Sequence, residues 1–237
     1  MDKNITKARA YFYEFLAYPL FFHTRDEKFA RWREQLSYLA QNPLSEQSAE
    51  AFANLEEFSF KELVNEQNKV LFGFTNIPLS ASFYEEGRDN GAARLRVIHC
   101  LNLSPYRRDK ELCKDSEDYV GFIFLAMATF LNDEFNGAKN ISDKLFSETL
   151  NLFVDEFGSL LLAHKNANFF RSYALILKDF IELERAVLSV EAPAKPQGDS
   201  VAMAALKKEP FQSKMPTIKT KLHWEEFSPV ISHEFKD

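Results

Sequence analysis

The chain has 237 residues, a formal net charge of −6 and 46% apolar residues, and its 24 Phe supply ample material for a buried core. Only 7 Gly and 9 Pro are present, which disfavours a turn-rich β architecture. The longest apolar run, 120–131, is shorter than the roughly 20 residues that a membrane-spanning helix needs. The start, MDKNITKARAYFYEF, has no apolar stretch with a cleavage site, and Cys100 and Cys113 lack CxxC spacing. We therefore expect a cytoplasmic protein with free thiols and no stable membrane insertion.

The first half of the chain shows helical patterns. Apolar residues recur at helical spacing in 5–18 and again in 25–41. Residues 59–62 (SFKE) have the form of a capping box and predict a helix that continues to Phe72. The next stretch, GFTNIPLSASFYEEGRDNG, is rich in Gly, Pro, Asn and Ser and predicts an ordered loop. Another helix is predicted from about 91 to 102.

The segment KDSEDYVGFIFLAMATFLNDEF, residues 114–135, changes from charged to almost wholly apolar. Asp115 is expected to be its N-cap, because its carboxylate can accept hydrogen bonds from the first backbone N–H groups. Glu117 and Asp118 would then lie in the first turn, where the helix dipole favours negative charge. A helix that is apolar on nearly all sides is packed by neighbours all round. We therefore predict that this segment is the central core helix, ended by Asn136–Gly137.

Two further helices are predicted over 142–164 and 167–190, and no strand-like alternation lasts beyond a few residues. These patterns predict an all-α domain that covers residues 1–190. From Pro193 the composition is linker-like, so 191–237 is interpreted as a linker and a partly irregular C-terminal extension. Its end, KLHWEEFSPVISHEF, is unusually apolar for a solvated tail and predicts a docking segment, against the body or against a partner.

No catalytic signature is present. The sequence has no GxSxG, Walker A, GxGxxG or HExxH motif, its five His are far apart, and no Glu-x-x-His pair could hold a di-iron centre. We expect no catalytic residues, no metal and no cofactor, and we interpret the protein as a non-enzyme. A small-molecule enzyme that uses a pocket at Asp118 is the weaker alternative, since no phosphate-binding loop is found. The acidic charge and the two Arg of AARLRVIHCL argue against nucleic acid as a partner.

The segment DSEDYVGFIFLAMATFL resembles the signature of the TorD/DmsD family, cytoplasmic chaperones that mature redox enzymes exported by the twin-arginine pathway. The family motif is approximately E-P-x-D-H, followed by a hydrophobic helix. In this chain Asp115 replaces the Glu, Ser116 replaces the Pro, Asp118 matches the Asp and Tyr119 replaces the His. The Tyr removes a group that could titrate near neutral pH.

Further segments are similar to the same family. Its second motif, LF followed by a Pro-rich loop that ends in S-x-Y, is similar to Leu71–Phe72, Pro78 and 82–84 (SFY), with one more residue between Pro and Ser than is usual. The opening AYFYEFLAYPLF resembles the family's first helix, and LFVDEFGSLLLAHKNANFFRSYALILKDFIE its last two. The resemblance spans residues 5 to about 188 with every element in order, and residues from 191 onward fall outside the family pattern.

The resemblance implies a single helical-bundle domain of the TorD-like type that acts as a chaperone. It would bind the twin-arginine leader of a molybdoenzyme, such as formate dehydrogenase or an S- or N-oxide reductase, and hold the apoenzyme for cofactor insertion before export. In the family the loop and the start of the central helix line one pocket, with an apolar groove for the leader and carboxylates for its arginines. The leader-binding residues implied here are Leu71, Phe72, Pro78, Ser82, Tyr84, Glu117, Asp118 and Tyr119.

Other interpretations stay open at this point. Capping suffices to explain Asp115 and Glu117, and core packing suffices for the aromatic residues of 71–84. An alternative function is a helical adaptor that binds a folded partner through its C-terminal segment, without leader recognition. That segment is also hypothesised to occupy the groove until a leader displaces it, in which case truncation at residue 190 would change the affinity for a leader. Both a monomer and a dimer are compatible with the sequence.

Overall fold

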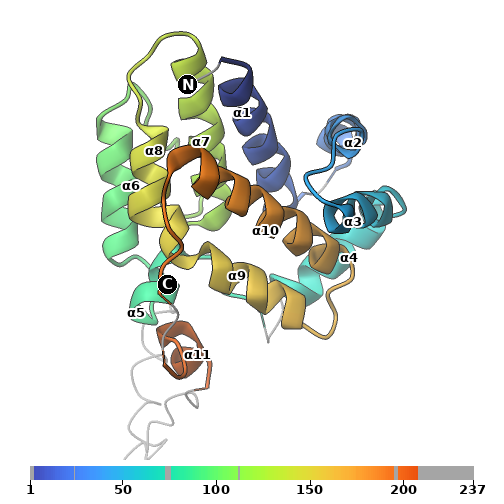
Figure 1. Cartoon of the computed structure of the whole chain (residues 1–237). Helices are drawn as coiled ribbons and strands as arrows, with labels where there is room; N and C mark the ends of the chain where they lie inside the picture. Colours follow the sequence, from blue (N-terminus) through green and yellow to red (C-terminus); the bar gives the residue numbers. More distant parts are fainter. Residues whose placement is uncertain (1–2, 24, 73–75, 112, 195–196, 208–237) are drawn as a thin grey trace, which may run out of the picture. The chain divides into compact units, whose positions relative to one another are not determined.

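The computed structural model describes residues 3–23, 25–72, 76–111, 113–194 and 197–207. These residues form helices that are joined by turns and loops (Figure 1). The predicted all-α class is confirmed. The described residues up to Leu206 belong to one compact unit. In chain order the elements are α1 (Lys3–Ala17), the 3₁₀ turn η1 (Tyr18–Leu20), α2 (Glu27–Ala40), α3 (Glu46–Glu56), α4 (Phe60–Val70), α5 (Ala81–Glu86), α6 (Ala92–Asn102), α7 (Val120–Phe135), α8 (Ser142–Leu145), the π-helical turn η2 (Phe146–Leu150), α9 (Asn151–Ala163), α10 (Phe169–Leu188) and α11 (Val201–Leu206).

Local sequence signals account for some of the helix boundaries. The capping box is confirmed: Ser59 Oγ accepts a hydrogen bond from the Glu62 backbone N at 3.3 Å, and Glu62 Oε2 accepts one from the Ser59 N at 2.8 Å. The predicted helix 142–164 is present as one continuous stretch in which η2 separates α8 from α9. Three helices were not predicted. They are α3, which has its own capping box at Ser45, α5, which lies inside the predicted loop, and α11, which lies in the predicted extension.

Helix α7 lies in the core as predicted, but its neighbours leave one side uncovered. It runs along α1 (Figure 1), and Phe124 and Leu131 have no exposed surface. Phe122, Leu125 and Thr129 share another side at helical spacing, and this side is only partly covered. The Leu125 side chain is 40% exposed. The expectation that neighbours pack all round this helix is therefore wrong for one apolar stripe.

The start of α7 also differs from the prediction. The helix begins one residue after Tyr119, its N-cap residue, whose backbone is extended and whose side chain makes no capping bond. Asp115 is therefore not the N-cap, and Glu117 and Asp118 precede the first turn instead of lying in it. The physical reason is a tertiary contact: an isolated antiparallel bridge pairs Tyr119 with Ser80, so Tyr119 is held extended against the chain before α5 and the helix starts only after it.

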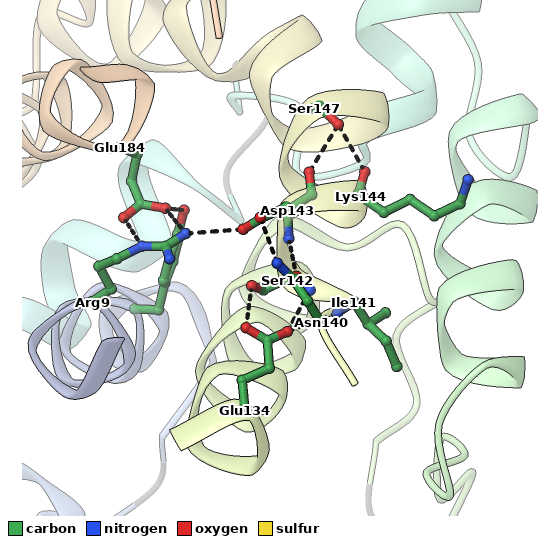
Figure 2. A network of polar contacts seen from close by, with 10 residues as sticks. Arg9, Glu134, Asn140, Ile141, Ser142, Asp143, Lys144, Ser147 and Glu184 are labelled. Atoms are coloured by element: carbon green, nitrogen blue, oxygen red, sulfur yellow. Dashed lines mark hydrogen bonds and ion pairs between the residues drawn. The ribbon is translucent and has the colours of Figure 1, made fainter. Parts of the chain in front are cut away.

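A buried ion pair connects the first and last long helices of the unit (Figure 2). Arg9 on α1 donates from Nε to Oε1 of Glu184 on α10 at 2.6 Å and from Nη2 to Oε2 at 3.0 Å. The Tyr13 hydroxyl donates to the same carboxylate at 2.9 Å, and Asp143 on α8 lies 3.8 Å from Arg9 Nη2. Arg9 is 2% exposed and Glu184 is fully buried. This bidentate contact fixes the relative register of α1, α8 and α10.

Figure 2 also shows how α7 connects to α8. Near the end of α7, Glu134 Oε1 accepts hydrogen bonds from the backbone N of Ile141 at 2.7 Å and of Ser142 at 2.9 Å, and its Oε2 accepts one from the Ser142 hydroxyl at 2.8 Å. The carboxylate thereby satisfies N–H groups at the start of the next helix, which have no partner in the helical ladder itself. The turn at Asn136–Gly137 ends α7 as predicted.

The compact unit continues beyond residue 190. Asn151 Nδ2 donates to the Glu191 carbonyl at 2.9 Å, and α11 packs against α5 with Ala202 fully buried. Gly87, which ends α5 with φ +68, lies where an added Cβ would be 3.1 Å from the Ala205 Cβ. The first residues of the predicted extension therefore belong to the body. The hypothesised placeholder, KLHWEEFSPVISHEF, lies outside the described residues.

Candidate functional site

Three serines hold the Asp118 carboxylate. Ser80 Oγ donates to its Oδ2 at 2.7 Å, Ser82 Oγ donates to the same oxygen at 2.5 Å, and the Ser116 hydroxyl donates to Oδ1. Asp118 is fully buried, and its carbonyl accepts a hydrogen bond from the Ala81 N at 2.8 Å. Burial by itself would raise the pKa of Asp118, but the hydroxyl bonds outweigh it and hold the pKa below its ordinary value. Asp118 therefore joins the 71–84 loop to the start of α7.

Two arginines neutralise Glu117. Arg94 Nε on α6 donates to its Oε2 at 2.6 Å, and Arg108 Nε donates to its Oε1 at 2.9 Å. Glu117 is 7% exposed, and burial would raise its pKa, but the bonds from Arg94 and Arg108 keep it below the ordinary value. Arg108 Nη1 also donates to the Cys113 carbonyl at 3.2 Å and to that of Asp115. Glu117 is thus the anchor of the connector between α6 and α7.

Tyr119, the last residue of the DSEDY segment, is nearly buried as well. Its hydroxyl donates to the Leu20 carbonyl, and its ring lies 5.4 Å from the Phe21 ring, centroid to centroid. Burial raises its pKa far above the ordinary value, so it stays neutral at physiological pH. A Cβ at Gly121 would come within 2.9 Å of the Tyr119 ring and 3.0 Å of the Phe21 ring. Glycine at 121 therefore lets these two rings close over the start of α7.

The loop and the segment before α7 together line a pocket of about 790 Å³, which we call the motif pocket. Of the predicted site residues, Leu71, Phe72, Pro78 and Tyr119 line it. The others do not: Ser82, Tyr84, Glu117 and Asp118 are buried behind its wall. Sequence reasoning missed most of its polar lining, which is Asn76, Ser80, Asp89, Asn90, Arg94, Arg108, Lys114, Asp115 and Ser116. Leu206 from α11 completes the wall.

The unpaired carboxylates of the motif pocket are not the predicted ones. Glu117 and Asp118 are fully engaged within the protein. Within the described part of the chain, the side chains of Asp89 and Asp115 form no hydrogen bond or ion pair, and both line the pocket. Partial burial raises the pKa of Asp115, and the nearby Arg108 opposes that rise. A cationic ligand in this pocket would therefore meet Asp115 and Asp89 first.

A second pocket, of about 800 Å³, adjoins the first at Lys114 and Asp115, which line both. We call it the apolar pocket. Its wall includes the uncovered stripe of α7 together with rings from the η1 region and α2, and Phe22 at its edge is 55% exposed. The sequence did carry a signal for it, because an α7 apolar on every side has more apolar surface than the core covers. The residues that line it include Glu14, Tyr18, Phe21, Phe22, Lys28, Arg31, Gln35, Arg107, Lys114, Asp115, Phe122 and Leu125.

Comparison with known proteins supplies no family for this chain. No family model matches the sequence. A search of curated proteins likewise gives no match. Among the described residues, none of the helices combines the length and the apolar character that a membrane crossing requires. The function is therefore argued from the two adjoining pockets, their unpaired groups and the sequence motifs around them.

Proposed function

We propose that the protein is a cytoplasmic chaperone of the TorD/DmsD type. It binds the twin-arginine leader of a molybdenum-containing oxidoreductase and holds the apoenzyme until the cofactor is inserted. The observation that carries the proposal is the junction of the two pockets at Asp115, where an unpaired carboxylate adjoins an open apolar surface. A twin-arginine leader has the complementary order, since its basic stretch is followed directly by an apolar one.

The resemblance of the motifs supports this proposal through the structural role that they have. Asp118 of the DSEDY segment and Ser82 of the SFY segment lie 36 residues apart, and the Ser82 hydroxyl donates a hydrogen bond to the Asp118 carboxylate at 2.5 Å. This bond belongs to the contact that brings the loop against the start of α7 and so closes the wall of the motif pocket. Such a pair can maintain the shape of a pocket although neither residue contacts the ligand.

The charges around the motif pocket refine which residues recognise arginine. A guanidinium pairs best with a carboxylate that has no other partner. Asp115 satisfies this condition and also borders the apolar pocket, whereas Asp118 would first have to leave three hydroxyl donors. Asp115 and Asp89 are therefore the recognising carboxylates of the proposal, and Asp118 and Glu117 hold the pocket in shape.

The test is calorimetric titration of the full chain with synthetic twin-arginine leaders from the molybdoenzymes of the same organism. Each leader is paired with a version in which both arginines are replaced by glutamine. We expect at least one leader to bind at micromolar Kd or tighter, about −8 kcal/mol, and its glutamine version to bind roughly tenfold more weakly. A chain that binds no leader, or binds both versions equally, contradicts the proposal. The adaptor alternative predicts that no leader binds.

A further inference from the structure

The apolar pocket exposes more apolar side chain than a folded core helix normally leaves in water. Leu125 is 40% exposed in the middle of α7, and Phe122 beside it is only partly covered. Across the pocket edge, Phe22 is 55% exposed, and its ring lies 6.0 Å from that of Phe72, which lines the motif pocket. Contiguous apolar surface of this kind marks a binding site for an apolar partner.

Two buried polar atoms of the same pocket have no hydrogen-bond partner among the described residues. They are Nε2 of Gln35, whose side chain is 96% buried, and the hydroxyl of Tyr18. Burial, followed by the charge of Asp26, raises the pKa of Tyr18 to about 12, so the hydroxyl keeps its proton at neutral pH. Buried donors without acceptors are costly and therefore rare in folded proteins. Both atoms would be satisfied by a ligand that brings acceptor oxygens.

The two arginines of the pocket indicate which acceptors these are. Arg31 is paired with Glu14 at 2.7 Å, and Arg107 Nη1 donates to the carbonyls of Leu101 at 2.7 Å and Ser104 at 3.1 Å. These two guanidinium groups therefore leave little demand for a carboxylate from outside. An apolar peptide segment carries neutral acceptors at every residue, its main-chain carbonyl oxygens, and these need partners once they leave water.

We propose that the apolar part of a bound leader lies along the Phe122–Leu125 stripe of α7, with main-chain carbonyl oxygens that accept hydrogen bonds from Gln35 and Tyr18. This inference rests on the proposed function and gives the bound peptide a direction. Its arginines lie at Asp115, where the two pockets meet, and the chain then continues into the apolar pocket. Gln35 donates a hydrogen bond to the peptide main chain, so it contributes affinity for any apolar sequence. Asp115 pairs with the arginines and thereby contributes the selection for them.

The experiment uses the full chain and a leader that binds the wild type. Gln35→Met keeps the volume of the side chain and removes the donor, Tyr18→Phe does the same for the hydroxyl, and Gln47→Met on the exposed face of α3 is the matched control. We expect each pocket variant to bind the leader roughly three- to tenfold more weakly, as the loss of one hydrogen bond predicts, and the control to bind like wild type. Because the donors are unpaired without ligand, the Tm of the unliganded variants is expected to stay equal or to rise.

A second readout identifies the acceptor. Replacing single amide bonds by ester bonds along the apolar part of the leader weakens the carbonyl acceptor there. At one position we expect the ester to reduce affinity for the wild type and to have no further effect on Gln35→Met. If Gln35→Met and Tyr18→Phe bind all peptides like wild type, the inference is overturned and the proposed function stands. If no leader binds the wild type, the proposed function fails and the inference fails with it.

Discussion

The buried polar groups behind the motif pocket differ from those in the apolar pocket in whether the protein supplies their hydrogen-bond partners. Asp118 and Glu117 are buried with every strong partner supplied by the protein, three hydroxyls for one and two guanidinium groups for the other. Gln35 and Tyr18 each have one buried polar atom that lacks a hydrogen-bond partner among the residues that the structure describes. Paired buried groups stabilise one arrangement of the chain, whereas unpaired ones lower stability until a ligand arrives. The comparison separates residues that build the site from residues that are free to bind.

The largest effect is expected where a buried charge loses its partner. Arg9→Met leaves the Glu184 carboxylate buried without its cationic partner, so we expect the free energy of unfolding to fall by about 3–5 kcal/mol, measured by urea denaturation. Lys144→Met removes one side of the exposed pair with Glu148 at 2.7 Å and should cost less than about 1 kcal/mol. The double variant Arg9→Met with Glu184→Leu should recover most of the loss. Equal costs for Arg9→Met and Lys144→Met would show that the buried pair has no special structural role.

The same reasoning distinguishes Asp118 from Asp115. Asp118→Asn deprives hydroxyl donors of a charged acceptor and should lower the free energy of unfolding by about 1–3 kcal/mol. Asp115→Asn removes a carboxylate without a side-chain partner, so its effect should stay within about 0.5 kcal/mol. Chemical denaturation of the two variants in parallel measures both. An Asp115 variant that is destabilised as much as the Asp118 variant would reverse the roles that we assign.

Acid should reduce the difference between wild type and Asp118→Asn. The pKa of Asp118 is lower in the folded than in the unfolded chain, so its carboxylate stabilises the fold fully above the unfolded pKa. This stabilisation is lost as the pH falls through the lower, folded pKa, whereas the Asn variant has no such group. Unfolding free energies measured from neutral pH downward should therefore converge. A difference that is constant across this range would mean that the charge of Asp118 is not what the serines stabilise.

The sequence was informative where structure is local and uninformative where partners are distant. The capping box at Ser59 and the end of α7 at Asn136–Gly137 depend on residues within one turn, and both predictions are confirmed. Asp115 was predicted as a cap by the same local reasoning, which failed because the bridge between Ser80 and Tyr119 holds Tyr119 extended and delays the start of the helix. No local pattern predicts that a residue just before a helix will form a strand-like contact with a loop 39 residues earlier.

The candidate site was predicted in outline only, for a similar reason. The two segments that the family resemblance pairs do line one pocket, and Leu71, Phe72, Pro78 and Tyr119 are on its surface. The burial of Asp118 depends on hydroxyls supplied by the chain before and within α5, and that of Glu117 on arginines from α6 and the connector. The apolar pocket draws its lining from several separate segments. Such constellations exist only once the tertiary structure is formed.

An effect on stability is also expected at the ring contact that closes over the start of α7. Gly121→Ala places a methyl group within 2.9 Å of the Tyr119 ring, so the rings must move, at a cost of about 1–3 kcal/mol. Gly158→Ala is the matched control, because a Cβ there meets nothing within 4 Å and alanine favours the helix by up to about 1 kcal/mol. Thermal unfolding should thus shift in opposite directions for the two variants. A shift in the same direction for both would show that the rings tolerate the methyl group.

The most direct test of leader recognition is a double-mutant cycle between Asp115 and the arginine pair. Wild type, Asp115→Asn and, as a charge-matched control on α3, Glu50→Gln are each titrated with a leader and with its glutamine version. We predict that replacing the arginines weakens binding to wild type and to Glu50→Gln alike, and weakens binding to Asp115→Asn by at least about 0.5 kcal/mol less. An unchanged effect of the arginines in Asp115→Asn would contradict the assignment of Asp115, and no effect in any of the three proteins would contradict the leader-binding function itself.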